Sequence, residues 1–193
     1  MSTKVLAVAS ALCMAGLALL LVQPSEARSG LVDWGSHPQA ILHTSAGDIT
    51  LLLRNDAAPL TVQHFIGFCR NHVYDGVIFD QVSPSFIYGG DILPDGSLKY
   101  SPHAYQWEER EIDSPLTHTP GHVGIRDFSG TEDTHLFNIC VEAYPAWDGL
   151  HTVFAEVIGG MDIVEAVYAS GDEDGVPHLV VVIESVEIVE AAQ

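Results

Sequence analysis

Short apolar runs, separated by polar and glycine-containing segments, recur along most of the chain, and this spacing is typical of β-strands. The runs at 40–43 and 49–53 flank a polar segment at 45–48, which predicts a β-hairpin. The other strand-like runs lie on both sides of residues 83–85 and at 136–141, 153–157 and 179–189. Strands therefore dominate, and a mainly β fold is predicted.

Two segments have the spacing of an amphipathic helix instead. The first begins at Pro59, which suits the first helical position, and the second begins at residues 160–161. Their apolar stripes consist of Val62, Phe65, Ile66 and Cys69 in the first helix and of Met161, Val164 and Val167 in the second. Because the helices do not alternate strictly with the strands, a doubly wound parallel sheet is not expected, and a closed or sandwich-like antiparallel architecture is favoured.

Several polar segments are interpreted as loops and turns without a bound metal. Residues 92–115 have no sustained period and predict a long loop. Residues 172–175 resemble half of a calcium-binding loop, but the first acid and the closing glutamate of that motif are missing, so a turn is favoured. His118 and His122 are separated by Pro120-Gly121, which prevents a shared helical face, and no metal site is expected there.

Length and charge limit the classes of function. The chain has 193 residues, 47% of them hydrophobic, which suffices for one domain with a real core and leaves little room for two. The formal net charge is −19, and no lysine or arginine follows Arg126. Such a surface repels phosphate backbones, so nucleic acid is not expected as a partner. The acidity is otherwise interpreted as a solvated face that aids solubility.

The N-terminal segment is interpreted as a targeting sequence rather than as part of the fold. Lys4 precedes an apolar run at residues 5–22, and small residues lead up to a predicted cleavage point after Ala27. Residues 1–27 therefore predict a secretory signal peptide. The run is also just long enough to span a bilayer, so an uncleaved signal anchor remains the alternative, with residues 5–22 as the only expected contact with the membrane. Residues 28–38 are a lead-in, and export from the cytosol is expected in either case.

Two cysteines remain in the domain once Cys13 leaves with the signal. Cys69 and Cys140 could pair in an exported protein. However, Cys69 ends a predicted helix and Cys140 lies in a predicted strand, and the sequence cannot bring them together. Two buried free thiols are favoured over a disulfide.

The segment from 79 to 91 carries a resemblance to a known family. It reads Phe-Asp-Gln-Val-Ser-Pro-Ser-Phe-Ile-Tyr-Gly-Gly-Asp and resembles the core segment of the cyclophilins, a family of peptidyl-prolyl isomerases, with the pattern Phe-His-Arg-(apolar)-x-Pro-x-Phe-(apolar)-x-Gln-Gly-Gly-Asp. The matching residues are Phe79, Val82, Pro84, Phe86, Ile87, Gly89, Gly90 and Asp91. The resemblance covers roughly residues 40–188. It implies a closed eight-stranded antiparallel barrel capped by two α-helices, in a domain from 39 to 193.

The resemblance also implies the chemistry. Rotation about an X-Pro bond has a barrier of roughly 18–20 kcal/mol, because the amide C–N bond has partial double-bond character. A hydrogen-bond donor aimed at the proline nitrogen stabilises the twisted state selectively, and this preference is catalysis. In the cyclophilins an arginine is the donor and an apolar pocket holds the proline ring, so neither a cofactor nor a metal is expected.

The chain departs from the family pattern at the catalytic position. Gln81 stands where the family has its arginine, and Asp80 replaces the preceding histidine. The family glutamine before the two glycines is missing, because Tyr88 runs directly into Gly89, and this shortens the strand by one residue. Since a neutral donor is weaker than a charged one, reduced isomerase activity is expected.

Arg126 is a candidate replacement for the missing cation. It stands where the family carries a small residue that lines the peptide groove. One hypothesis is that its guanidinium reaches the proline site or binds substrate carbonyls. The alternative is a salt bridge to Asp127, Asp133 or another nearby acid.

This sequence matches the cyclophilin pattern better at the residues of the proline pocket than at the hydrogen-bond donor. By resemblance, the substrate-binding residues are Phe86, Ile87, His135, Phe137, Trp147 and His151. The simpler interpretation of Phe86 and Phe137 is that both belong to the core.

Three functions are thus compatible with the sequence. The first is a weak isomerase acting on X-Pro bonds of exported proteins, with proline-containing peptides or unfolded proteins as partners and a monomeric state. The second is a proline-peptide-binding module that has lost catalysis. The third is a membrane-tethered interaction domain.

Overall fold

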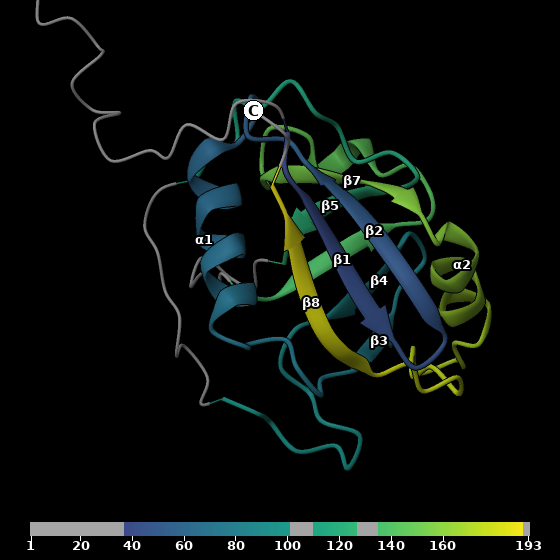
Figure 1. Ribbon diagram of the computed structural model, residues 1–193. Helices are drawn as coiled ribbons and strands as arrows, with labels where there is room; N and C mark the ends of the chain where they lie inside the picture. Colours follow the sequence, from purple (N-terminus) through teal and green to yellow (C-terminus); the bar gives the residue numbers. More distant parts are fainter. Residues whose placement is uncertain (1–36, 101–109, 127–134, 191–193) are drawn as a thin grey trace, which may run out of the picture. The chain divides into compact units, whose positions relative to one another are not determined.

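The computed structural model describes residues 37–100, 110–126 and 135–190 (Figure 1). The predicted targeting sequence at 1–27 and most of the lead-in lie outside the described residues. Within the described ranges, no helix is both long and apolar enough to cross a membrane.

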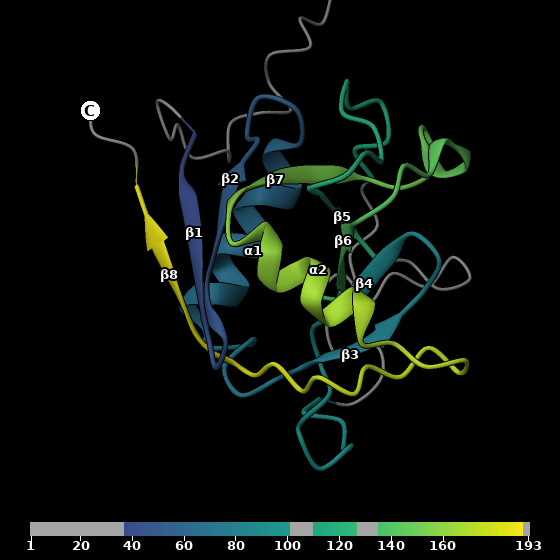
Figure 2. The same ribbon diagram turned by 90° about the vertical axis from the view of Figure 1, so that its right-hand side faces the viewer.

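Eight antiparallel strands form one curved sheet, ordered β3-β4-β6-β5-β7-β2-β1-β8 (Figures 1 and 2). The strands are β1 (Gln39–Thr44), β2 (Gly47–Leu53), β3 (Phe79–Val82), β4 (Phe86–Gly89), β5 (His122–Ile125), β6 (Phe137–Cys140), β7 (Val153–Gly159) and β8 (Ile183–Val189). The two ends of the sheet meet where Ile78 bridges Val182 and the amide of Ile183 donates to the carbonyl of Val77 at 2.8 Å. The predicted eight-stranded antiparallel fold is confirmed, with closure by this bridge rather than by a full ladder.

The first two strands form the predicted hairpin. Leu42 pairs with Ile49, and Thr44 pairs with Gly47, so that the turn consists of Ser45 and Ala46 alone. Along both strands, buried residues alternate with more exposed ones, because successive side chains point to opposite faces of a sheet. The spacing of apolar residues in this segment is therefore enough to predict the hairpin and to say which of its faces packs in the core.

Both predicted helices are present, α1 (Pro59–Arg70) and α2 (Met161–Ala169). Figure 1 shows them on either side of the strands, with α1 packed on β8 and β7 and α2 on β4, β2 and β3. Glu111 caps α1, because its carboxylate accepts from the amides of Leu60 at 3.0 Å and Thr61 at 2.8 Å. Gly160 precedes α2 with a φ of 79°, where a Cβ would meet the carbonyl oxygen of Asp48 at 2.2 Å.

The main core is enclosed by the curved sheet and receives buried side chains from both helices, including Val164 and Val167 of α2. All four apolar positions predicted for the α1 stripe are buried, and the aromatic residues of the core are Phe65, Tyr74, Phe79, Phe137 and Phe154. Each large apolar side chain buried in this way contributes about 1.5–3 kcal/mol relative to exposure. This core holds the strands that carry the candidate site.

Both cysteines of the domain are free and buried. The favoured interpretation, two free thiols, is therefore what the structure contains. Burial raises the pKa of the Cys140 thiol to about 12 and that of Cys69 still further. Neither thiol is reactive at neutral pH, since the thiolate is the nucleophilic form.

The last strand begins later than predicted, at Ile183 instead of residue 179. Val176, Leu179 and Val180 are exposed although they are apolar, and their segment runs beside β3, where the amide of Val82 donates to the carbonyl of Gly175 at 2.8 Å. The prediction that β8 begins at residue 179 was wrong, because it rested on apolar composition alone. The turn predicted at residues 172–175 is confirmed, with Asp172 Oδ1 accepting two backbone amides at 2.9 Å.

Candidate active site

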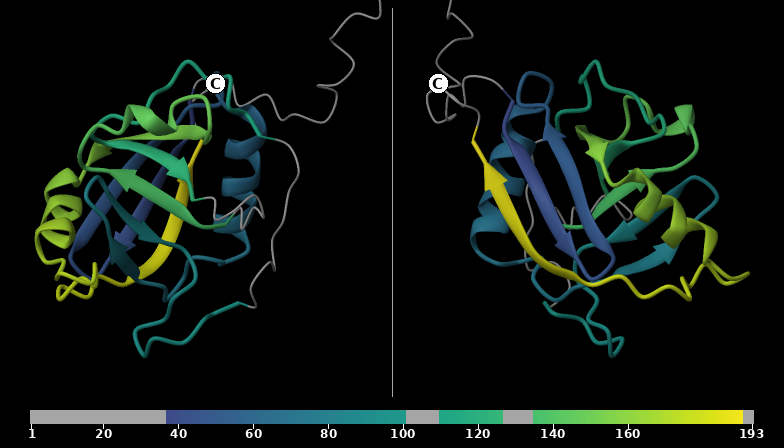
Figure 3. Two further views of the ribbon diagram at one scale, coloured as in Figure 1. Left: turned by 180° about the vertical axis from the view of Figure 1, so that it is seen from behind. Right: turned by 45° about the vertical axis from the view of Figure 1, so that its right-hand side comes forward.

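Strands β3, β4 and β6 are neighbours in the sheet, and the left view of Figure 3 shows this part of the ribbon from behind. Their pairing places one set of side chains on a common face. Gln81 pairs with Tyr88 across β3 and β4, and Tyr88 pairs with Asn138 across β4 and β6. Phe86 lies two residues before Tyr88 and therefore points the same way. We refer to this surface as the Gln81 face.

Arg126 brings a cation to the Gln81 face. It follows β5 directly, and only 8% of the residue is exposed. Its Nη2 donates to Gln81 Oε1, its Nη1 lies 3.6 Å from the Asp80 carboxylate, and its Cζ lies 4.4 Å from the centroid of the Tyr88 ring. The alternative interpretation of Arg126, an ion pair with a nearby acid, is what the structure contains. That acid is Asp80, while residues 127 and 133 lie outside the described residues. The guanidinium also contacts Gln81, and its role toward a substrate stays a prediction.

Burial dominates the electrostatics of this group. Desolvation raises the pKa of Asp80 to about 6, against the opposing effect of Arg126. Desolvation likewise lowers the pKa of Arg126, against the effects of Asp80 and Tyr88, yet a guanidinium remains charged at neutral pH. Burial also raises the pKa of Tyr88, whose hydroxyl lies 3.2 Å from Ser83 Oγ. The cation is therefore held in a polar but poorly hydrated setting, where its field is stronger than in water.

A cluster of rings lies next to this polar group. Phe86 stacks on Trp147 with ring centroids 4.6 Å apart and an interplanar angle of 14°. Trp147 in turn lies 4.5 Å from the His151 ring, and Tyr144 meets Phe86 edge-on at 5.4 Å. Trp147 is carried by the short 3₁₀ helix η2 (Pro145–Trp147). The structure therefore brings together three of the predicted substrate-binding residues, Phe86, Trp147 and His151.

The other three predicted substrate-binding residues lie elsewhere. Ile87 is fully buried in the main core, and Phe137 is 1% exposed there, in ring contact with Tyr74 at 5.5 Å and Phe79 at 6.1 Å. His135 is 2% exposed and meets the Tyr100 ring at 6.1 Å. The physical reason is the alternation of strand side chains: Phe86 and the next residue cannot both line one face.

Asn138 and His118 belong to the site, although sequence reasoning did not select them for it. Asn138 is fully buried on the Gln81 face, one residue beyond the predicted Phe137. His118 is 1% exposed and meets the Phe86 ring at 6.2 Å. The signal for Asn138 was its polarity inside an otherwise apolar strand, which marks the face that is not core.

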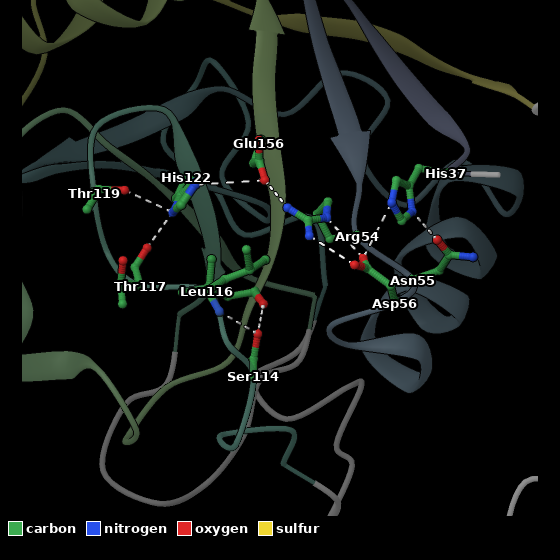
Figure 4. A network of polar contacts seen from close by, with 11 residues as sticks. His37, Arg54, Asn55, Asp56, Ser114, Leu116, Thr117, Thr119, His122 and Glu156 are labelled. Atoms are coloured by element: carbon green, nitrogen blue, oxygen red, sulfur yellow. Dashed lines mark hydrogen bonds and ion pairs between the residues drawn. The ribbon is translucent and has the colours of Figure 1, made fainter.

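A separate polar network, drawn in Figure 4, involves none of these residues. Arg54 donates to Asp56 from Nε and Nη2, at 2.9 Å each, and also to Glu156. His122 lies 3.9 Å from the Glu156 carboxylate and 3.0 Å from Thr119 Oγ1. The network joins the ends of β2, β7 and β5, and pairs of this kind contribute at most about 1 kcal/mol each. In the described part of the chain, no group of three or more His, Cys, Asp or Glu residues could hold a metal ion.

Comparison with known proteins places this geometry in a family. The family described as cyclophilin type peptidyl-prolyl cis-trans isomerase/CLD matches residues 40–188. The chain is 31% identical over 162 residues to peptidyl-prolyl cis-trans isomerase B of Escherichia coli, covering 77% of this chain and 98% of that protein. It is 32% identical over 164 residues to peptidyl-prolyl cis-trans isomerase cyp18 of Streptomyces antibioticus, covering 76% and 96%.

Longer relatives match over the same domain. The chain is 35% identical over 130 residues to peptidyl-prolyl cis-trans isomerase 9 of Schizosaccharomyces pombe, covering 66% of this chain and 21% of that protein. It thus spans only about a fifth of the length of that relative. The fold, the family match and these relatives agree, and the chain belongs to the cyclophilin-type peptidyl-prolyl cis-trans isomerase family.

Proposed function

We propose that the domain is a peptidyl-prolyl cis-trans isomerase in which Gln81, polarised by Arg126, donates to the proline nitrogen. The observation that carries the proposal is the contact of Arg126 Nη2 with Gln81 Oε1. Gln81 stands at the position of the family's catalytic arginine, so the cation missing from that position is supplied by the residue that follows β5, a strand separated from β3 by β4 and β6.

The contact with Arg126 also orients the amide of Gln81. A guanidinium has N–H donors and no acceptor, so the amide oxygen must face it. The amide NH₂ group then points the other way and is the part of Gln81 that can donate to a substrate. A positive charge at the oxygen draws electron density from the nitrogen, which makes its N–H a stronger donor.

This donor suits the twisted state of an X-Pro bond. Rotation out of conjugation leaves a lone pair on the proline nitrogen, and a hydrogen bond to that lone pair forms only in the twisted state. Trp147 and His151 are partly exposed and can pack against the proline ring beside the donor, while Phe86 supports Trp147 from a buried position. No covalent step is involved.

The activity is proposed to be lower than that of an enzyme with arginine at the catalytic position. A neutral hydrogen bond contributes about 0.5–1.5 kcal/mol and a charge-assisted one about 1.5–3 kcal/mol. The difference of about 1.4 kcal/mol corresponds to roughly a tenfold lower rate. Polarisation by Arg126 recovers part of it.

A protease-coupled isomerisation assay with an X-Pro peptide tests the proposal, using Gln81→Glu as the decisive variant. Glutamate has the size of glutamine and keeps a partner for Arg126, but at neutral pH it has no N–H to donate. We expect kcat/KM to fall at least tenfold in Gln81→Glu, which has lost the donor, and severalfold in Arg126→Ala, which has lost only its polarisation. Parental activity that survives in Gln81→Glu would show that another group is the donor.

A catalytically inactive proline-peptide-binding module is the second candidate function. The ion pair between Arg126 and Asp80 favours it, because paired charge is less available to a substrate. In that case the parent binds an X-Pro peptide by titration calorimetry but shows no turnover, whereas the isomerase shows both.

We also propose that the protein is exported, acts as a monomer, and meets unfolded or proline-containing proteins outside the cytosol. The apolar run at residues 5–22 and the small residues before position 28 support export. N-terminal sequencing of the protein from fractionated cells tests this, with a mature start at residue 28 expected. A product in the membrane fraction that retains residues 1–27 would favour the anchor, and a cytosolic product would contradict export. Light scattering of the purified protein tests the monomeric state.

A further inference from the structure

His118 lies at the junction of the rings proposed to hold the proline. Its ring meets Phe86 at 6.2 Å and 87°, Trp147 at 5.9 Å and 85°, and His151 at 6.4 Å and 90°. All three contacts are edge-to-face, the arrangement that aromatic pairs favour. His118 itself is 1% exposed. It lies behind the ring cluster rather than on its outer surface.

Hydrogen bonds tie His118 to both ends of η2. The backbone amide of His118 donates to Asp148 Oδ1 at 2.7 Å, and its Nδ1 lies 3.0 Å from the same oxygen. The amide of Tyr144 donates to the carbonyl of His118 at 2.8 Å. Tyr144 precedes η2 and Asp148 follows it. The helix that carries Trp147 is therefore fastened at its start and at its end to one residue.

The protonation state of His118 follows from these partners. Burial lowers its pKa, against the effect of Asp148, so the ring is neutral at pH 7. An ionised carboxylate only accepts hydrogen bonds, so the single ring proton must be on Nδ1. Nε2 is then an acceptor, and it is buried without a hydrogen-bond partner among the described residues.

A buried acceptor without a partner is unfavourable, and an apolar residue would fill the same space without that cost. The imidazole therefore provides something that a hydrocarbon cannot. That is the Nδ1–H donor to Asp148, which fixes the end of η2 and the angle of the Trp147 ring.

We propose that His118 is a positioning residue, which holds Trp147 stacked on Phe86 and thereby shapes the surface for the proline ring. The inference rests on the proposed isomerase function for its kinetic consequence alone. Because His118 acts on ring binding and not on the donor at Gln81, its loss should raise KM and leave kcat nearly unchanged.

The test compares two amide replacements of His118 in the purified protein. In His118→Asn the amide nitrogen takes the place of Nδ1 and can still donate to Asp148. In His118→Gln the amide lies at the position of Nε2 and cannot. We expect His118→Gln to raise KM about 5–20-fold with kcat changed less than twofold, and His118→Asn, which loses the ring contacts but keeps the donor to Asp148, to raise KM clearly less than His118→Gln does.

Asp148 provides a matched pair in which a folding failure is not expected, since 30% of its side chain is exposed. Asp148→Asn keeps an acceptor for both hydrogen bonds of His118, and Asp148→Leu has none. We expect Asp148→Leu to resemble His118→Gln, and Asp148→Asn to resemble the parent.

The indole N–H resonance of Trp147 gives a readout that does not depend on turnover, assigned by its loss in Trp147→Phe. It should shift or broaden in Asp148→Leu, which keeps the imidazole but removes its acceptor, and stay in place in Asp148→Asn. An unchanged resonance in Asp148→Leu, or an equal rise in KM in His118→Asn and His118→Gln, would overturn the proposal. A parent without turnover or peptide binding would overturn the proposed function instead, and the resonance would still decide the role of His118.

Discussion

The candidate site has a polar half and a ring half, and different interactions hold each of them in place. The polar half consists of Asp80, Gln81 and Arg126, where buried charges depend on one another. The ring half, formed around Phe86 and Trp147, is held by packing and by the neutral His118. A charged group can act at the same place from a different strand, because the arginine side chain is long and flexible and requires only an acid or another acceptor close to its guanidinium. A stacked ring depends on its own backbone position, so it has less freedom to move.

This difference predicts that the two halves respond differently to pH. The polar half contains Asp80, whose pKa burial raises to about 6, whereas the stacked rings of Phe86 and Trp147 in the ring half carry no charge at any pH. The free energy of unfolding of variants in each half, measured at two pH values, therefore distinguishes stabilisation by packing from stabilisation by charge.

The most damaging single change should be Phe86→Ala. The side chain is 2% exposed and stacked on Trp147, and deleting a buried phenylalanine costs about 3–5 kcal/mol. We expect this loss in the free energy of unfolding, measured by urea denaturation, to be equal at pH 5 and pH 8. A loss that changes by more than about 1 kcal/mol between the two would mean that the ring half is coupled to a titrating group.

Arg126→Ala should cost about 3 kcal/mol at pH 8 and clearly less at pH 5. At pH 8 the change leaves an ionised Asp80 buried without its cation, which is the costly way to break a buried pair. At pH 5 Asp80 is mostly protonated, and a neutral carboxyl needs no cation. The double variant Arg126→Ala/Asp80→Asn is the control and should recover most of the loss at pH 8. Equal losses at both pH values would contradict the charge-based account.

Asp80→Asn should remove a pH dependence that the parent has. The pKa of Asp80 is raised from 3.8 to about 6 by folding, so between these values the folded state holds a proton that the unfolded state releases. The parent therefore loses stability as the pH rises from 4 to 7, by up to about 3 kcal/mol for this group. The difference in unfolding free energy between parent and Asp80→Asn should fall over this range. Parallel stability curves would show that the pKa of Asp80 is not raised.

The sequence predicted the features that depend on local pattern. The hairpin around residues 45 and 46 follows from alternating apolar positions, and α1 follows from its stripe and from Pro59. The segment at 79–91 carried the family resemblance without any knowledge of register. These features need only residues close to one another in the chain.

The arrangement of the site could not be predicted in the same way. The polarity of Asn138 indicates which face of β6 is not core, but its position opposite Tyr88 depends on the register of β6 against β4, which no local pattern fixes. The contact of Arg126 with Gln81 joins residues 45 positions apart. His118 looked like half of a doubtful metal pair, and its role depends on Asp148, 30 positions away.

The most direct test exchanges the two polar residues and follows kcat/KM for an X-Pro peptide in Gln81→Arg/Arg126→Gln and in each single variant. If the cation at Arg126 acts through Gln81, kcat/KM falls severalfold in Arg126→Gln. The exchange variant, which carries the guanidinium at position 81, then equals or exceeds the parent. A parent whose activity is unchanged by Arg126→Gln would contradict the account, because the relocated cation would then contribute nothing to catalysis.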